Sequence, residues 1–165
     1  MKKHQITFLI LSIFIISAFG SIDADIENKN VDRTIDITSQ LVKISYKITL
    51  DHKGKNNINS YEFVVPESER DNLAFIIAKD ASKKEIKFTE GKSKYGVTFT
   101  MAIPGNSPNP TIYIDTVLTK SLKPYPTHIT QSERQLVRYF GNLYFYSPYK
   151  TVSQKNHCPL ELKIH

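Results

Sequence analysis

A strict alternation of apolar and polar side chains is the sequence feature that most constrains the fold of this chain. The clearest case covers residues 42–50, where apolar side chains stand at every even position: Val42, Ile44, Tyr46, Ile48 and Leu50. Lysine, serine and threonine occupy the odd positions between them. Because successive side chains of a β-strand point to opposite faces, this pattern predicts a strand with one face on a core and the other in water.

The same reasoning extends this strand backwards to Arg33, since apolar residues stand at odd positions as far as Leu41. The change of phase between Leu41 and Val42 requires one extra residue in the register, so we expect a β-bulge or a bend there. Residues 21–32 are polar and acidic without an apolar period. We expect them to form an extended lead-in.

Further stretches of alternation predict about five more strands, separated by segments rich in Gly, Pro, Asn and Asp. The strands are expected within residues 61–65, 73–77, 86–88, 95–103 and 111–119, with turns or loops at 51–57, 90–92 and 104–110. Residues 131–140 fit one or two helical turns capped by Thr130 or Ser132, because their apolar residues have helical spacing. The chain is thus expected to be all-β, an antiparallel β-sandwich-like domain with an amino-terminal signal helix.

The first twenty residues have the composition of a secretory signal. Lys2 and Lys3 precede an apolar run over residues 6–19, and the small residues Ala18 and Gly20 predict cleavage before Ser21. A membrane anchor is the alternative, but the run of about 14 residues is shorter than the roughly 20 that a spanning helix needs. We therefore expect a signal peptide at 1–20 and one lumenal domain at 21–165, soluble in the secretory lumen.

The formal net charge of +6 falls to +4 when Lys2 and Lys3 are removed, because 20 basic residues (22 minus 2) then stand against 16 acidic ones. The excess is spread along the chain, which is typical of a solvated surface and does not predict a nucleic-acid partner. A weak attraction to anionic lipid surfaces stays open. Cys158 is the single cysteine, so no intrachain disulfide can form, and we expect a buried thiol or a partner in another chain.

No pattern typical of catalysis or of cofactor binding occurs in the sequence. It contains no HExxH, no GxSxG, no glycine-rich phosphate loop and no paired cysteines, and its histidines lack metal-ligand spacing. We therefore predict no catalytic residue, no metal and no cofactor. A Cys158–His128 nucleophile pair is left open, although the sequence offers no third group to orient it.

The least regular stretch covers residues 122–149 and reads LKPYPTHITQSERQLVRYFGNLYFYSPY. The prolines on both sides of Tyr125 favour an extended edge or a rigid connector, and an aromatic residue before Pro126 makes that bond a candidate for the cis form. The polar residues 127–135 either satisfy their own backbone or dock another protein. The aromatic residues at 139–149 form either core with a half-exposed face or a contact surface.

This stretch resembles the ribophorin I family, whose members are subunits of the oligosaccharyltransferase of the endoplasmic reticulum. The matching residues are 124–127, 129–133, 135, 141–142 and 144–149, and a fainter similarity covers 33–50. The resemblance implies a β-sandwich-like lumenal domain. It also implies a subunit interface or structural motif formed by Pro124, Tyr125, Pro126, Thr127, Gln131, Ser132, Glu133, Gln135, Gly141, Asn142, Tyr144, Tyr146 and Tyr149.

The function implied by this resemblance is that of a non-catalytic subunit. The complex transfers a dolichol-linked oligosaccharide to Asn-x-Ser/Thr of nascent proteins, and another subunit carries the active site and the metal. The expected partners are the other oligosaccharyltransferase subunits and the nascent polypeptide. Because relatives are longer and membrane-anchored, the chain is expected to be their amino-terminal lumenal part, held at the membrane by the complex or by a downstream segment.

Two alternatives come from other classes of protein. The first is a free-standing secreted β-sandwich binding module, which needs no membrane anchor. The second is a small secreted hydrolase in which Cys158 would be the nucleophile.

Overall fold

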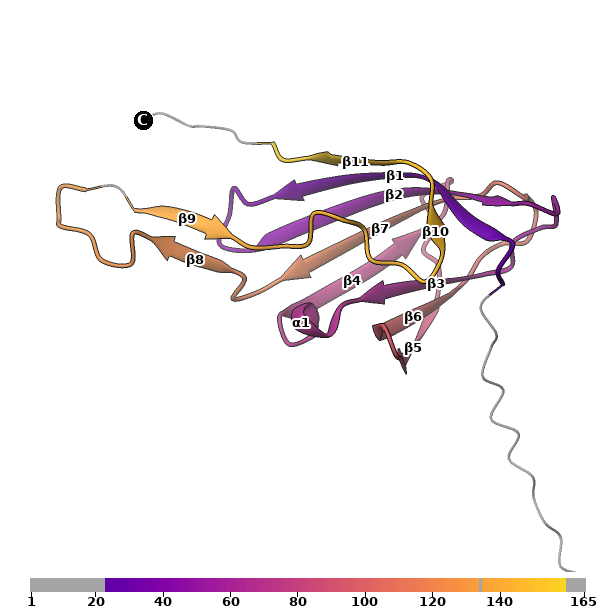
Figure 1. The fold of residues 1–165 in the computed structure, drawn as a ribbon, viewed down its shortest axis with the longest axis horizontal. Helices are drawn as coiled ribbons and strands as arrows, with labels where there is room; N and C mark the ends of the chain where they lie inside the picture. The colour runs from indigo at the N-terminus through magenta and orange to yellow at the C-terminus, as the bar shows by residue number, and fades with distance from the viewer. Residues whose placement is uncertain (1–22, 134, 160–165) are drawn as a thin grey trace, which may run out of the picture.

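The computed structural model describes residues 23–133 and 135–159, which Figure 1 shows as a ribbon. The expected signal peptide, its helix and the cleavage before Ser21 lie outside these residues. Within the described ranges, no helix has the length and the apolar character needed to cross a membrane. The described residues form eleven strands and one short helix.

The larger sheet contains the strand with the clearest alternation. Its antiparallel strands follow the order β1 (Ile26–Asp36), β2 (Val42–His52), β7 (Thr111–Leu118) and β4 (Leu73–Lys79). On the other side of β1, the short strands β10 (Lys150–Thr151) and β11 (Gln154–His157) pair parallel to it. The last described strands therefore complete the sheet edge beside the first one.

A smaller antiparallel sheet has the order β3 (Ser60–Val65), β6 (Gly96–Ala102) and β5 (Phe88–Ser93). The helix α1 (Glu67–Arg70) follows β3 directly, because Pro66 cannot donate to a strand ladder and acidic residues suit the first helical turn. The hairpin of β8 (Leu122–Tyr125) and β9 (Leu136–Tyr139) forms a separate sheet, which projects from the body in Figure 1.

The two larger sheets pack face to face and enclose one hydrophobic core. Tyr46 of β2 meets Phe63 of β3 edge-on, with ring centroids 5.2 Å apart. The hydroxyl of the buried Tyr61 donates to Asn28 Oδ1 at 2.9 Å, and Asn28 is itself fully buried. An all-β, sandwich-like domain is therefore confirmed, and the parallel pairs among the described strands are those that β10 and β11 form with β1.

The strand expected over residues 42–50 is confirmed as β2, but its extension back to Arg33 is wrong, since residues 33–36 belong to β1 and a connection at 37–41 joins the two strands. The change of phase is a reversal of the chain, and β1 and β2 direct their inward side chains to the same core. The extended lead-in is likewise wrong, because β1 begins at Ile26. Its inward positions include the polar Asn28 and Arg33, so apolar periodicity could not reveal it.

Three other differences have local causes. The helical turns expected at 131–140 are wrong, because residues 136–139 form β9, whose pairing with β8 outweighs the helical spacing of its apolar residues. β5 continues to Ser93 through the turn expected at 90–92, since β6 pairs with it residue by residue. In β4, a register shift between Leu73 and Phe75 turns Phe75 outward, where it is 52% exposed.

Alkaline titration tests the packing of the tyrosines. Burial raises the pKa of Tyr46 and of Tyr149 to about 12, and it raises the pKa of Tyr61 as well. Since the pKa of an unfolded tyrosine is about 10, the folded state holds these protons more tightly. The contribution of Tyr46 and Tyr149 to stability is complete below about pH 10 and is lost between about pH 10 and 12. We expect the free energy of unfolding, measured in urea, to fall across that window.

The double variant Tyr46→Phe, Tyr149→Phe serves as the test of cause, because it removes two of the buried hydroxyls. Its free energy of unfolding should fall less steeply between pH 10 and pH 12 than that of the unchanged chain. Tyr144→Phe removes a hydroxyl from a side chain that is 80% exposed and should leave the slope unchanged. An equal slope in the double variant and the unchanged chain would contradict burial as the cause.

Candidate docking hairpin and groove

The β8–β9 hairpin is attached to the sandwich at its base and exposed along its length. Leu122 and Tyr139 form the first pair of its ladder and pack against the core. Beyond them the apolar side chains face solvent, since Leu136 is 62% exposed and Val137 is 52% exposed. Apolar residues grouped on the surface of a projecting element are typical of a site that docks another molecule.

Arg138 lies over two aromatic rings on the hairpin. Its guanidinium carbon lies 4.1 Å from the ring centroid of Tyr125 and 5.3 Å from that of Phe140. Both rings are more than half exposed, so the stack presents a cation between two aromatic surfaces. The Tyr125–Pro126 peptide bond is cis, as the sequence suggested.

The polar residues at the tip of the hairpin bond to their own segment. Thr130 N–H donates to Glu133 Oε2 at 2.7 Å, and Glu133 N–H donates to the Thr130 carbonyl at 3.1 Å. The hydrogen bonds from Thr130 hold the pKa of the Glu133 carboxyl below its usual value. Gln135 Nε2 donates to the Pro126 carbonyl at 3.3 Å. These are contacts in which side chains satisfy the backbone of an irregular loop.

From β9 the chain returns across the sandwich as an irregular strap, residues 140–149, before it enters β10 (Figure 1). Side chains of β11 form hydrogen bonds with the backbone of the strap, which pairs with no strand of the described part of the chain at these residues. Gln154 Nε2 donates to the Leu143 carbonyl at 2.7 Å, and its Oε1 accepts from the Phe145 N–H at 2.8 Å. Asn156 Nδ2 donates to the same Leu143 carbonyl at 2.9 Å.

The aromatic side chains of the strap divide between core and surface. Tyr149 is buried and stacks on Tyr61, with ring centroids 4.9 Å apart. Phe145 packs against the core, with its centroid 5.6 Å from that of Tyr46. The exposed apolar and aromatic members are Phe140, Leu143, Tyr144 and Tyr146. The core interpretation of this cluster therefore holds for its inward members, and the others are accessible to a partner.

The strap and α1 meet at Arg33, a charged residue of β1 that is only 2% exposed. Its Nη1 donates to the Asn142 carbonyl, and its guanidinium carbon lies 5.7 Å from the Tyr46 ring centroid. Asn142 Nδ2 in turn donates to Glu69 Oε1 of α1 at 3.5 Å. Burial raises the pKa of Glu69, and the nearby Arg33 charge opposes that rise. Arg33 therefore connects β1, the strap and α1.

Two buried polar atoms beside this cluster have no hydrogen-bond partner among the described residues: Arg33 Nε and the Tyr139 hydroxyl. Gly141 allows the Tyr139 side chain to lie where it does, because a Cβ atom at that glycine would clash with the tyrosine ring. Folded proteins leave few buried polar groups unpaired, so these two atoms distinguish the cluster from the rest of the core.

Three adjoining hollows between α1 and the strap form a groove, named here the α1 groove, and Asn142 lines all three. The narrow centre, with a cavity of about 20 Å³, lies against Arg33 and Glu69. The end beside the hairpin, of about 370 Å³, is lined by residues that include Lys120, Lys123, Tyr139 and Phe140. The other end, of about 490 Å³, is lined by residues that include Lys94, Tyr95 and Tyr146.

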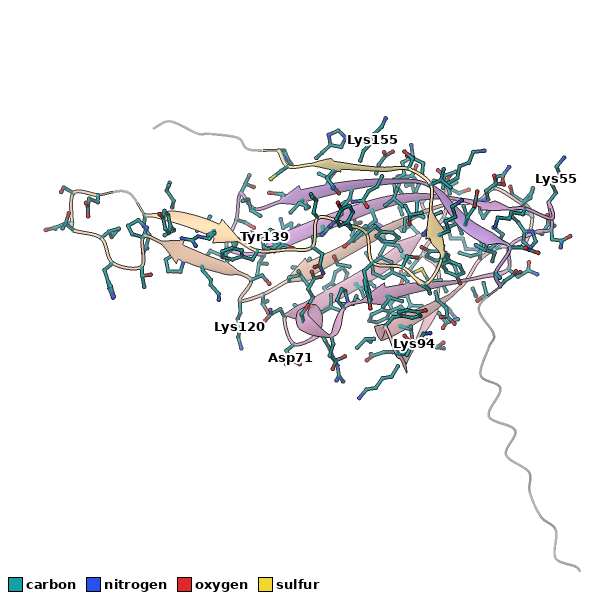
Figure 2. The ribbon with its side chains drawn as sticks, in the orientation of Figure 1. Lys55, Asp71, Lys94, Lys120, Tyr139 and Lys155 are labelled. Carbon is teal, nitrogen blue, oxygen red and sulfur yellow. The ribbon has the colours of Figure 1, made fainter. Side chains whose placement is uncertain are left out.

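Figure 2 shows Lys120 and Lys94 on opposite sides of α1, in agreement with their places at the two ends of the α1 groove. Tyr139, also labelled there, lies where the hairpin joins the body. The arrangement combines hydrogen-bond donors, ammonium groups and aromatic rings along one surface. Such a surface can bind a ligand that carries both oxygen acceptors and apolar groups.

The residues expected to form an interface or structural motif lie in three places. The hairpin carries Pro124, Tyr125, Pro126, Thr127, Gln131, Ser132, Glu133 and Gln135. The strap carries Gly141, Asn142, Tyr144 and Tyr146 along the α1 groove, and it carries Tyr149 in the core. Sequence reasoning missed Arg33, Glu69 and Lys120 as members of a site. An arginine at an inward position of a strand is the signal that could have revealed the first of them.

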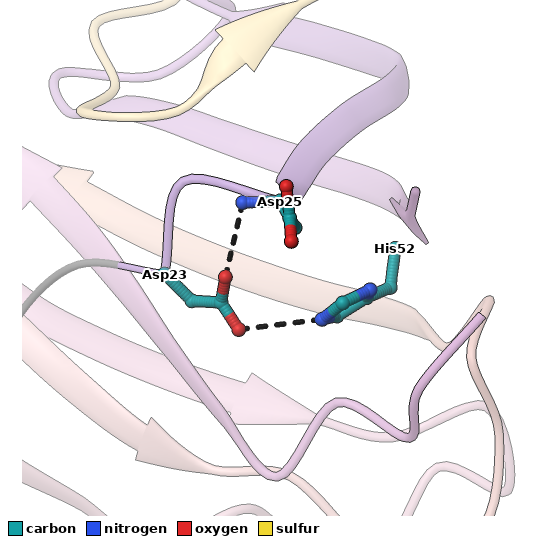
Figure 3. A group of neighbouring side chains, drawn as sticks. All are labelled: Asp23, Asp25 and His52. Carbon is teal, nitrogen blue, oxygen red and sulfur yellow. Dashed lines mark hydrogen bonds and ion pairs between the residues drawn. The ribbon is translucent and has the colours of Figure 1, made fainter. Parts of the chain in front are cut away.

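A separate group at the start of β1, formed by Asp23, Asp25 and His52, brings metal-ligand side chains together (Figure 3), with ligand atoms within 4.8 Å of one another. His52 Nδ1 accepts the Gly54 N–H at 3.0 Å, so the proton of the neutral ring is on Nε2, 3.3 Å from Asp23 Oδ2. Asp23 Oδ1 accepts the Asp25 N–H at 3.0 Å. Both ring nitrogens are therefore occupied, and the group ties the start of β1 to the end of β2.

Cys158 is exposed and makes no disulfide, so the buried thiol that the sequence left open is wrong. His128, its proposed base, lies in the exposed loop between β8 and β9. Neither residue lines the α1 groove.

Comparison with known proteins shows which sequences are similar to this chain. A family model described as Ribophorin I matches residues 26–163. The chain is 33% identical over 151 residues to dolichyl-diphosphooligosaccharide–protein glycosyltransferase subunit 1 of Caenorhabditis elegans, and 32% identical over 167 residues to subunit 1B of Arabidopsis thaliana. The alignments cover 87% and 88% of this chain but only 26% and 35% of those relatives. The chain thus spans about a quarter to a third of their length.

Among solved structures, native leukotriene A4 hydrolase from Saccharomyces cerevisiae is similar, with a TM-score of 0.53 and 15% sequence identity. The likeness covers 82% of this chain and 24% of that one. At this identity it shows a shared fold for the β-sandwich and carries nothing about activity.

Replacing Arg33 by methionine keeps a long side chain but removes the donor to the Asn142 carbonyl and the positive charge near Glu69. We expect the free energy of unfolding to fall by about 1.5–3 kcal/mol, the usual contribution of a hydrogen bond to a charged group. We also expect chymotrypsin to cleave the strap faster. Urea denaturation and limited proteolysis measure the two effects. Arg138→Met, on the exposed hairpin, removes cation–π contacts with two exposed rings and should lower the free energy of unfolding by at most about 1 kcal/mol without changing cleavage of the strap. An unaltered cleavage rate in Arg33→Met would contradict the anchoring role.

The hydrogen bonds of His52 predict that metal ions do not stabilise the fold. We expect the melting temperature to stay within about 1 °C on addition of zinc chloride or of EDTA, since a ligand stabilises only by binding the folded state. A rise of several degrees with zinc that is lost in His52→Gln would show instead that the group binds a metal.

Proposed function

Because this chain belongs to the ribophorin I family, we propose that it acts as a non-catalytic subunit of the oligosaccharyltransferase complex in the endoplasmic reticulum. The complex transfers a dolichol-linked oligosaccharide to Asn-x-Ser/Thr of nascent proteins, and this chain contributes a lumenal β-sandwich to it. Membrane association through the other subunits and contact with the nascent polypeptide belong to the same proposal.

One observation carries the proposal. The match to curated relatives named as subunit 1 extends over 87% of this chain at 33% identity, in a nematode, and over 88% at 32%, in a plant. The family model likewise begins at β1 and continues past β11. The likeness is therefore a property of the whole sandwich together with its hairpin and strap.

The chemistry of the α1 groove supports a binding role. The α1 groove presents a buried guanidinium, amide and hydroxyl groups, lysines and aromatic rings. These groups recognise and hold a partner, whereas hydrolysis or transfer requires a nucleophile next to a base that can activate it.

We assign the contact with another subunit to the β8–β9 hairpin. Its apolar side chains at Leu136 and Val137 lie on opposite faces, because adjacent strand residues alternate, and both are more than half exposed. Phe140 continues this apolar surface at the base and is 69% exposed. A partner that covers both faces would remove these side chains from water, which is favourable by about 25 cal/mol per Å² of apolar area.

A double variant with Leu136→Asp and Val137→Asp tests the docking role. Because both side chains are exposed, the sandwich should fold with an unchanged melting temperature. With an epitope tag at Ser21 and mild detergent, we expect recovery of the other oligosaccharyltransferase subunits to fall roughly tenfold or more, as for other interface anchors. Quantitative mass spectrometry of the purified material provides the measurement.

Val152→Asp is the matched control, since Val152 lies near β11 and is 56% exposed. It should leave the recovery unchanged. Full recovery with the double variant would show that the hairpin is not part of the interface, although the chain would still be a subunit of the complex. If the unchanged chain recovers no oligosaccharyltransferase subunit, the secreted binding module becomes the better description.

A further inference from the structure

We propose that the α1 groove binds an extended, acidic segment of a partner polypeptide. This goes beyond membership of the complex, because it assigns a second recognition site and the chemistry of its ligand. The hairpin and the groove adjoin at Lys123, Tyr139 and Phe140, but they differ in chemistry. The hairpin offers the exposed apolar side chains of Leu136 and Val137, whereas the groove offers cations, hydrogen-bond donors and aromatic rings.

The charge of the groove is the first argument. Among its acidic residues, Glu67 Oε1 lies 3.5 Å from Arg70 Nη1, and Glu69 Oε1 accepts a hydrogen bond from Asn142 Nδ2 at 3.5 Å. None of the ion pairs between described residues includes Lys94, Lys120 or Lys123. Two of these lysines stand at one end and the third at the other. A ligand with carboxylates along its length would complement this arrangement.

The Arg33 side chain supplies a second reason. Arg33 is 2% exposed and lines the narrow centre of the groove, and its Nε has no hydrogen-bond partner among the described residues. Tyr139 lines the hairpin end, where the Arg33 guanidinium opposes the rise that burial causes in the pKa of the tyrosine hydroxyl. A centre of about 20 Å³ admits a group as small as a single oxygen atom. A carbonyl or carboxylate oxygen of the ligand would satisfy such a donor.

The exposed aromatic side chains of the strap favour a polypeptide over a small anion as the ligand. Tyr144 and Tyr146 line the groove while 80% and 41% exposed, and Tyr146 meets Tyr95 edge-on at 6.2 Å. A small anion would leave these rings uncovered. The side chain of Asn142, which borders all three hollows, can both donate to and accept from the amides of an extended backbone. Carboxylates, backbone amides and apolar side chains occur together in a polypeptide.

The test uses the full chain and two fluorescein-labelled peptides of about nine residues, one with alternating Glu and Tyr and one with alternating Lys and Tyr. We expect the Glu–Tyr peptide to bind in fluorescence polarisation and the Lys–Tyr peptide to bind at least about tenfold more weakly. Lys120→Glu with Lys123→Glu should weaken binding of the Glu–Tyr peptide by roughly threefold to tenfold or more, because two favourable charge contacts become repulsive. Tyr146→Ala should also weaken it.

Lys43→Glu with Lys47→Glu is the matched control, because it makes the same change of charge at exposed positions on the outer face of β2. It should bind the Glu–Tyr peptide within about twofold of the unchanged chain. Equal binding of the two peptides, or equal losses in the groove and control variants, would overturn the proposal. So would binding to phosphatidylserine vesicles without binding to the peptide. None of these results bears on recovery of oligosaccharyltransferase subunits, so the two proposals fail separately.

Discussion

The buried charge of Arg33 is the interaction on which the irregular part of this structure depends. A guanidinium that is 2% exposed needs acceptors and aromatic faces around it, and those come from three distant places in the chain. The strap supplies the Asn142 carbonyl, β2 supplies the Tyr46 ring, and α1 supplies Glu69. β2 lies beside β1 through their ladder, in which Arg33 and Tyr46 are partners. The strap is also held by Gln154 and Asn156, and Arg33 adds its contact at the centre of the groove.

The regular strands could be predicted because their positions depend on which side chains are apolar and therefore avoid water. The strands expected at 61–65, 95–103 and 111–119 are confirmed as β3, β6 and β7. Residues 26–32 of β1 escaped prediction because Asn28 and Arg33 occupy inward positions and form hydrogen bonds with residues far along the chain. Periodicity measures hydrophobicity alone, so it cannot recognise a buried polar side chain whose partners are distant.

The structure of the stretch 122–149 could likewise be predicted only in part. Its residues marked it as unusual, and the extended Pro-Tyr-Pro edge was predicted correctly at β8. The helical spacing of its later apolar residues predicts a helix where the structure has β9, because the pairing that decides the outcome lies across the hairpin. Lys94 and Lys120 carry no sequence signal at all, since a lysine in a groove and a lysine on an open surface look alike before α1 and the strap come together.

The parallel pairing of β10 and β11 with β1 has a consequence for biosynthesis. Asn28 receives two of its hydrogen-bond partners, Ser147 and Thr151, from positions 119 and 123 residues later. A ribosome adds about 5–20 residues per second, so β1 waits several seconds or more for its neighbour. During that interval the nascent sandwich has an open edge, which invites pairing with other chains. The edge of β1 is covered only after β11, which ends at His157, has been synthesised.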